Sequence, residues 1–185
     1  KVTIENGMAK VEVNIAAISA QKKEYDHAVR LAEQRQYSEA KKVLKGLLKD
    51  NPSNSEYHRI YGQILSDEGD QEGAINHLID ALRWNPRNNH ALTMMGNIYA
   101  KFKNDVDTAL VYYEQAVRLN PKDNIALNNI GANLIQSGKT EAGKNYFLRA
   151  LDINPDYPNT LYALGLVAEM EGNIQEAFEW AIKAL

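Results

Sequence analysis

Residues 119–155 read LNPKDNIALNNIGANLIQSGKTEAGKNYFLRALDINP, which is one full period of a pattern that recurs along the chain. The period opens and closes with an Asn-Pro pair, and the same dipeptide occurs at Asn51-Pro52 and Asn85-Pro86. The four prolines follow one another at intervals of 34, 35 and 34 residues. Because proline lacks an amide hydrogen and disfavours helical geometry in the residue before it, each pair ends a helix at the same phase of a repeat.

Small and bulky residues also recur at fixed distances before each proline. A small residue stands twenty-four positions before the proline in three units and twelve before it in all four: Ala28, Gly62, Gly131; Ala40, Ala74, Ala109, Gly143. Small side chains at both places let two antiparallel helices approach closely. A bulky residue follows four positions after the second small one, on the same helix face: Leu44, Leu78, Tyr113, Phe147.

The third unit is one residue longer than its neighbours. Gly96 and Tyr99 fall at the repeat positions found by counting 34 residues forward from the second unit. Tyr113 falls at its repeat position only when residues are counted back from Pro121. The extra residue is therefore placed in the turn between the two helices, around 103–105, where lengthening a loop costs little.

These units resemble the tetratricopeptide repeat (TPR) family, whose 34-residue pattern is Trp-x2-Leu-Gly-x2-Tyr, then Ala-x3-Phe, then Pro. The third unit matches the first-helix part of this pattern, with Leu92 and Gly96 among its residues. The fourth unit matches the second-helix part, where Phe147 stands at the Phe position. The tryptophan is replaced throughout, by leucine or by His58, and the first unit has His27 where an apolar residue belongs. These two histidines fall at core-type positions, so we expect them to pack inside the repeats.

The resemblance implies an all-α fold, a solenoid of antiparallel helix hairpins that forms a right-handed superhelix over 19–185. The units are expected near residues 21–54, 55–88, 89–123, 124–157 and 158–185. Their ten helices are predicted at 21–34, 37–50, 55–68, 71–84, 89–102, 106–119, 124–137, 140–153, 158–171 and 174–185.

Residues 1–18 follow another pattern and are interpreted as a leader or as the end of a preceding domain. Val2 and Ile4 alternate with polar residues, a second alternating run begins at Val11, and Asn6-Gly7 between them favours a tight turn. A β-hairpin is predicted here; a leader docked on the first helix is the alternative. Because the chain begins without Met and ends inside a helical pattern, we interpret it as a piece of a larger protein.

Composition excludes several classes of function. The 185 residues carry a net charge of −3, which argues against nucleic acid as a partner, since phosphate binding needs a basic surface. No apolar run approaches the roughly 18 residues of a membrane span. The absence of cysteine excludes thiolate metal sites and leaves the compartment open.

No pattern of catalytic or metal-binding residues is present in the sequence. The four histidines, His27, His58, His77 and His90, lack partners three or four residues away on a helix. No glycine-rich phosphate loop, nucleophile elbow or paired-carboxylate motif occurs. We therefore predict that the chain is not an enzyme and holds no metal or cofactor.

The resemblance implies that peptides bind in the groove lined by the first helix of each unit. The predicted peptide-binding residues lie in units three to five: Thr93, Asn97, Ile125, Asn128, Asn129, Asn159, Tyr162 and Leu166. One subclass of the family binds acidic chaperone tails with a clamp of Lys, Arg and Asn. Asn97 and Asn129 match its asparagines, but the cationic places hold Thr93, Asn159 and Ala163. An acidic tail is therefore not expected, whereas amides suit a peptide backbone because they both donate and accept.

Three hypotheses about function remain open at this point. The first is a protein-interaction scaffold that binds an extended peptide segment in the concave groove. The second is a non-catalytic recognition or targeting part of a larger enzyme, and the third is a structural module that assembles into a homo-oligomer through its terminal units. The sequence names neither the partner nor the compartment.

Overall fold

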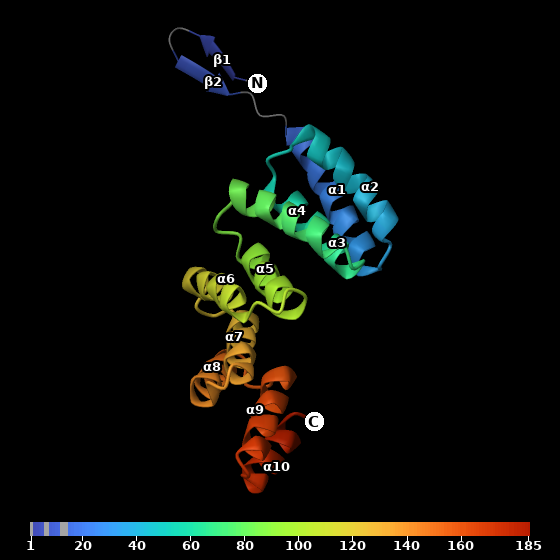
Figure 1. Cartoon of the computed structure of the whole chain (residues 1–185). Coiled ribbons are helices and arrows are strands. Elements are labelled where there is room, and N and C mark those ends of the chain that lie inside the picture. The colour runs from blue at the N-terminus through green and yellow to red at the C-terminus, as the bar shows by residue number, and fades with distance from the viewer. Residues whose placement is uncertain (1, 6–7, 12–14) are drawn as a thin grey trace.

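The structure is a computed structural model that describes residues 2–5, 8–11 and 15–185. Figure 1 shows an elongated stack of helix hairpins that runs from the N-terminal to the C-terminal end. The helices of this described part are α1 (Ile15–Glu33), α2 (Tyr37–Asp50), α3 (Ser55–Asp67), α4 (Gln71–Trp84), α5 (Asn89–Lys101), α6 (Val106–Leu119), α7 (Asn124–Gln136), α8 (Thr140–Ile153), α9 (Pro158–Met170) and α10 (Ile174–Lys183). The predicted all-α solenoid is confirmed.

Nine of these ten helices begin at the predicted residue, and the first does not. Helix α1 begins at Ile15 instead of residue 21. Its added turns, from Ile15 to Ala20, include three alanines and contain neither proline nor glycine, so helix propensity extends the segment. Helix α10 ends at Lys183, two residues before the predicted end.

The Asn-Pro pairs end the second helix of each unit as predicted. Asn85 is the C-cap of α4, with φ −139° and ψ 90°, and its amide still donates to Ala81 O. Pro86 then prevents another helical turn. After a short turn, the side chain of Asn88 caps α5 by accepting from the backbone N–H of Ala91 at 3.1 Å. One short segment therefore both ends one helix and starts the next.

The small residues mark where paired helices touch. A Cβ added at Gly131 of α7 would lie 2.7 Å from the Phe147 ring of α8 and 3.0 Å from the Gly143 carbonyl oxygen. Phe147 is 1% exposed. The predicted phase of the repeat is therefore correct, because only glycine lets the ring sit against the α7 backbone.

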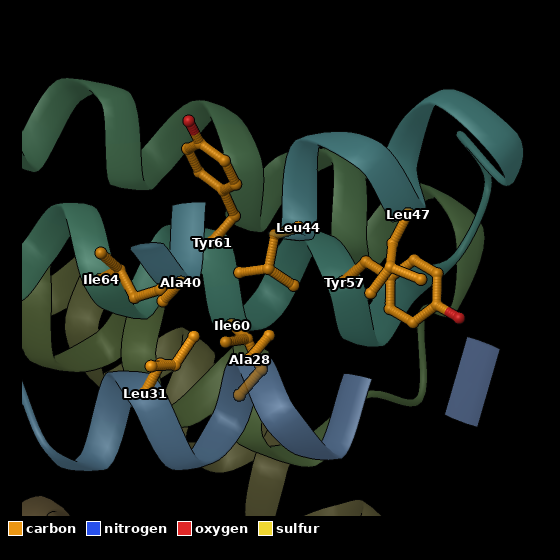
Figure 2. Close-up of a cluster of buried hydrophobic side chains, with 9 residues drawn as sticks. All are labelled: Ala28, Leu31, Ala40, Leu44, Leu47, Tyr57, Ile60, Tyr61 and Ile64. Atoms are coloured by element: carbon orange, nitrogen blue, oxygen red, sulfur yellow. The ribbon is translucent and has the colours of Figure 1, made fainter. Parts of the chain in front are cut away.

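Each unit also packs against the first helix of the next unit. Figure 2 shows this for the first cluster, in which α1 and α2 contribute Leu31 and Leu44, and α3 contributes Tyr57 and Ile64. The core is a chain of such clusters along the stack, as expected when each repeat contacts only its neighbours.

Two strands are present near the N-terminus, although the predicted second run began at Val11, the residue where the second strand ends. Strand β1 (Val2–Glu5) pairs antiparallel with β2 (Met8–Val11), with Val2 opposite Val11 and Glu5 opposite Met8. The predicted turn at Asn6-Gly7 lies outside the described residues, and the role of residues 1–18 stays a prediction. In the part of the chain that the structure describes, no helix has the length and apolar character needed to cross a membrane.

Candidate functional site

The first helices of successive units form the inner face of the stack. Helix α5 contacts both α3 and α7, and α7 contacts α9, so side chains from different units meet across these helices. The predicted residues Thr93 and Asn97 lie on α5, Asn128 and Asn129 on α7, and Asn159 on α9.

Asn97 and Asn129 form a hydrogen-bonded amide pair between units three and four. Asn129 Nδ2 donates to Asn97 Oδ1 at 2.9 Å, and the Tyr113 hydroxyl donates to the same oxygen at 2.8 Å. Burial raises the pKa of Tyr113, so its phenol stays protonated and remains a donor at neutral pH. The Asn97 side chain is therefore held by two donors from two different helices.

The pair leaves one donor and one acceptor for a ligand. Within residues 15–185, no protein group bonds to Asn97 Nδ2 or to Asn129 Oδ1. Both residues are only partly buried. An amide donor beside an amide acceptor matches the C=O and N–H of an extended peptide unit.

A second polar contact links units four and five. The hydroxyl of the buried Thr160 donates to Asn128 Oδ1 at 2.8 Å, which fixes the Asn128 side chain and leaves its NH2 group. Thr93 is 8% exposed and its hydroxyl donates to Asn89 O at 3.1 Å, so it offers a ligand little surface. Asn159 is exposed and donates to the Tyr157 hydroxyl at 3.4 Å.

The predicted apolar residues are exposed, as a binding role needs. Ile125 on α7 is 49% exposed, Tyr162 63% and Leu166 42%. Tyr162 and Leu166 also line a cleft of about 300 Å³ between α9 and α10. The structure thus brings Asn97 together with Asn129, and places Tyr162 and Leu166 beside the last helix.

A smaller cleft of about 250 Å³ lies between α3 and α5, next to the amide pair. Asn97 lines it together with Gln63, Lys101 and Phe102. Phe102 is 57% exposed and was missed from the sequence. It occupies a place that is polar in the neighbouring units, Glu68 among them, so comparison of the units could have found it.

The charged groups on the inner face of the first two units bind one another. Arg59 Nε donates to Glu56 Oε2 at 2.8 Å, and Asn88 Nδ2 donates to Glu56 Oε1 at 2.8 Å. The Tyr25 hydroxyl donates to Glu56 at 3.4 Å, and its pKa is raised by burial. Arg59 and Glu56 are therefore paired with each other, whereas none of the eight predicted binding residues of units three to five is charged.

Two histidines that are distant in sequence meet between α3 and α4. His58 Nε2 lies 2.9 Å from Pro52 O, which can only accept, so this nitrogen carries the hydrogen. His58 Nδ1 then accepts from His77 Nδ1, 3.1 Å away. Burial lowers the pKa of His77, and His58 lowers it further, while the Asp80 carboxylate opposes both.

The histidine predictions were right for His58 and wrong for His27. His58 is 8% exposed and packs inside the repeat, whereas His27 is exposed on α1, where it lines a cleft together with Leu31 and Val43. In residues 15–185, no three His, Asp or Glu side chains converge in a way that could hold a metal ion.

Comparison with known families identifies these units. Family models described as tetratricopeptide repeat match residues 25–88, residues 90–123 and 126–157, and residues 146–179. The chain belongs to the tetratricopeptide repeat family. A role in protein–protein interaction follows from this membership at the level of the family.

Two curated relatives share part of this TPR chain. The peroxisomal targeting signal receptor of Saccharomyces cerevisiae is 30% identical over 83 residues, which are 45% of this chain and 14% of the receptor. The protein O-mannosyl-transferase TMTC1 of Mus musculus is 33% identical over 153 residues, which are 80% of this chain and 16% of the transferase. The chain therefore spans only a small part of either relative.

Solved structures share the fold at low sequence identity. The structure titled for functional characterization of Pseudomonas aeruginosa pilF has a TM-score of 0.83 and 20% identity, covering 90% of this chain and 75% of that one. YrrB, described as a TPR protein with an unusual peptide-binding site, has a TM-score of 0.67 and 22% identity, covering 94% and 91%.

Proposed function

We propose that this TPR chain is a non-catalytic interaction module that holds an extended segment of a partner protein along α5, α7 and α9. The observation that carries the proposal is the Asn97–Asn129 pair, which is fixed by the Tyr113 hydroxyl and leaves one donor and one acceptor. Ile125 supplies an apolar surface beside it on α7. The description of YrrB as a peptide binder supports this use of the fold.

The charge distribution points to an uncharged stretch of the partner. No Lys or Arg stands among the eight predicted binding residues, and Arg59 on the preceding unit is already paired with Glu56. These eight residues offer a carboxylate none of the charge-assisted hydrogen bonds that would fix it. Affinity should therefore come from backbone hydrogen bonds and apolar side chains, and should depend little on salt.

A phage-displayed library of 12-residue peptides, selected against the whole chain, tests this function. Asn129→Ala should weaken the selected peptides by about tenfold, since a lost hydrogen bond in a desolvated site contributes about 1.4 kcal/mol. Asn145→Ala is the matched control, because Asn145 is an exposed asparagine on the outer helix α8. Affinity should change less than about threefold between low and moderate salt.

Two results would contradict this function. Peptides that bind Asn129→Ala and Asn145→Ala equally well do not use the amide pair. Acidic peptides whose binding collapses with salt would instead indicate an electrostatic site.

The O-mannosyl-transferase relative favours a second function, a recognition segment within a larger enzyme. In that case the same groove binds part of the enzyme's protein substrate, and the chemistry lies outside these residues. Activity of the isolated chain on any selected peptide would contradict both functions. Assembly into a homo-oligomer through the terminal units stays a third prediction, to be tested by sedimentation.

A further inference from the structure

Phe102 is an exposed aromatic residue at the end of α5, beside the cleft between α3 and α5. It is the C-cap residue of α5 and is 57% exposed. The C-cap residues of α3, α7 and α9 are Glu68, Ser137 and Glu171, which are all polar. Because much of the Phe102 ring stays in water after folding, a ligand that covers it would gain apolar contact.

The cleft beside Phe102 lies inside the stack and not at one of its ends. It has a volume of about 250 Å³ and is lined by residues of α3 and α5. Helix α3 also contacts α1, and α5 also contacts α7, so a unit lies on either side of it. Asn97, which pairs with Asn129, forms part of its wall. A segment held by this amide pair therefore has a pocket beside it with room for one large side chain.

The cleft has apolar surface on one side and polar groups on the other. Met94, Ile98 and Phe102 of α5 supply the apolar surface. On the α3 side, Gln63 Nε2 donates to Asp67 Oδ1 at 3.0 Å, and both residues line the cleft. Within residues 15–185, no group donates to Asp67 Oδ2. The cleft therefore matches a side chain with an apolar body and a hydrogen-bond donor at its tip.

Two opposite charges make the cleft a poor site for a charged side chain. Lys101 and Asp67 both line it, and neither forms an ion pair with another residue of the described part of the chain. A carboxylate would be attracted by Lys101 and repelled by Asp67, and a guanidinium would experience the reverse. A neutral aromatic side chain avoids this conflict, because an ammonium group also favours the face of an aromatic ring.

We propose that the α3–α5 cleft binds a tyrosine side chain of the segment held by the Asn97–Asn129 pair. The tyrosine ring lies between Phe102 and the Lys101 ammonium group, and its hydroxyl donates to Asp67 Oδ2. Side chains alternate along an extended segment, so one peptide unit binds the amide pair while the adjacent side chain enters the cleft. This inference rests on the proposed function and adds to it the residue that the partner must carry.

The 12-residue peptides selected against the whole chain test this inference. Those whose binding depends on Asn129 should carry Tyr at one fixed position, and replacing this Tyr by Ala should weaken binding at least about tenfold. Phe102→Ala should weaken binding about fivefold, whereas Trp84→Ala, which removes a 52% exposed ring from α4, should not. Because both rings are exposed, neither substitution should shift the thermal midpoint much.

A double-mutant cycle tests where the tyrosine hydroxyl lies. With the original chain, replacing the peptide Tyr by Phe should weaken binding about tenfold, because a hydrogen bond to a charged group is lost. With Asp67→Ala, the same replacement should change binding less than about twofold, because the acceptor is gone. Asp152→Ala, which removes an exposed acidic residue from α8, is the control and should keep the tenfold difference, written as about tenfold in affinity.

The contrary results are distinguishable from one another. Peptides that lose affinity with Asn129→Ala but not with Phe102→Ala would occupy the groove without the cleft, so the proposed function would stand and this inference would fail. Peptides that carry Asp or Glu and lose affinity with Lys101→Ala would show that the cleft is an anion site. Peptides that ignore both Asn129→Ala and Phe102→Ala, or a selection that enriches nothing, would contradict the inference and the proposed function together.

Discussion

Replacing two helical glycines by alanine should change the free energy of unfolding in opposite directions. Gly131 lies inside α7, where an added Cβ would be 2.7 Å from the Phe147 ring and 3.0 Å from the Gly143 carbonyl oxygen. Gly46 lies inside α2, where an added Cβ would meet nothing within 4 Å. The substitution is the same at both positions, and only the packing around it differs.

The expected magnitudes follow from two opposing effects. Alanine favours a helix over glycine by roughly 0.5–1 kcal/mol, and both variants gain this. At Gly131, overpacking costs about 1–3 kcal/mol, because the ring of Phe147 and the backbone of α8 must both withdraw. We therefore expect Gly131→Ala to lower the free energy of unfolding by about 0.5–2 kcal/mol and Gly46→Ala to raise it by about 0.5–1 kcal/mol.

Urea unfolding followed by circular dichroism measures both changes, provided that the slope with denaturant is unchanged. A double variant supplies the control. The first unit naturally pairs Ala28 with Leu44, so Gly131→Ala should cost less in a Phe147→Leu background than alone. Midpoints that shift equally and in the same direction for Gly131→Ala and Gly46→Ala would refute the assigned helix contact.

Two further predictions concern the polar contacts. The pKa of His77 is lowered in the folded chain, so the unfolded chain binds more protons below about pH 6.5 and the free energy of unfolding should fall on acidification. Between neutral pH and about pH 5.5, His77→Gln should lose less of this free energy than the original chain, and an equal loss would show that other groups cause the pH dependence. Tyr113→Phe removes a donor to Asn97, so it should lower the free energy of unfolding by about 0.5–1.5 kcal/mol and weaken the binding of peptides selected for the groove. Peptide affinity that is unchanged in fluorescence anisotropy would show that the Tyr113 hydroxyl does not position the Asn97 amide.

Helix boundaries were predictable from sequence wherever a local chemical cause fixed them. Asn85-Pro86 ends one helix by removing a donor, and Asn88 starts the next by capping it, so both boundaries follow from a few adjacent residues. The start of α1 was missed because the alternation of Val11, Val13 and Ile15 was interpreted as a strand, whereas an uninterrupted run of helix-forming residues from Ile15 forms a helix.

Contacts between units were harder to predict than boundaries. Thr93 occupies a groove position by count, yet close packing buries it. His58 and His77 are 19 residues apart and showed no helical spacing, because their contact joins two antiparallel helices.

Three polar contacts between consecutive units share the same separation in sequence. Glu56 with Asn88, Asn97 with Asn129, and Asn128 with Thr160 are each 32 residues apart. This separation is slightly shorter than one repeat. A side chain on the first helix of one unit therefore contacts a residue of the next unit that lies about half a helical turn or more before the equivalent position. Pairs at this separation therefore act as links between consecutive units and hold the angle between them. Since two of the three links are uncharged, we predict that the curvature of the C-terminal half does not change with salt and that the Asn97–Asn129 pair keeps its geometry.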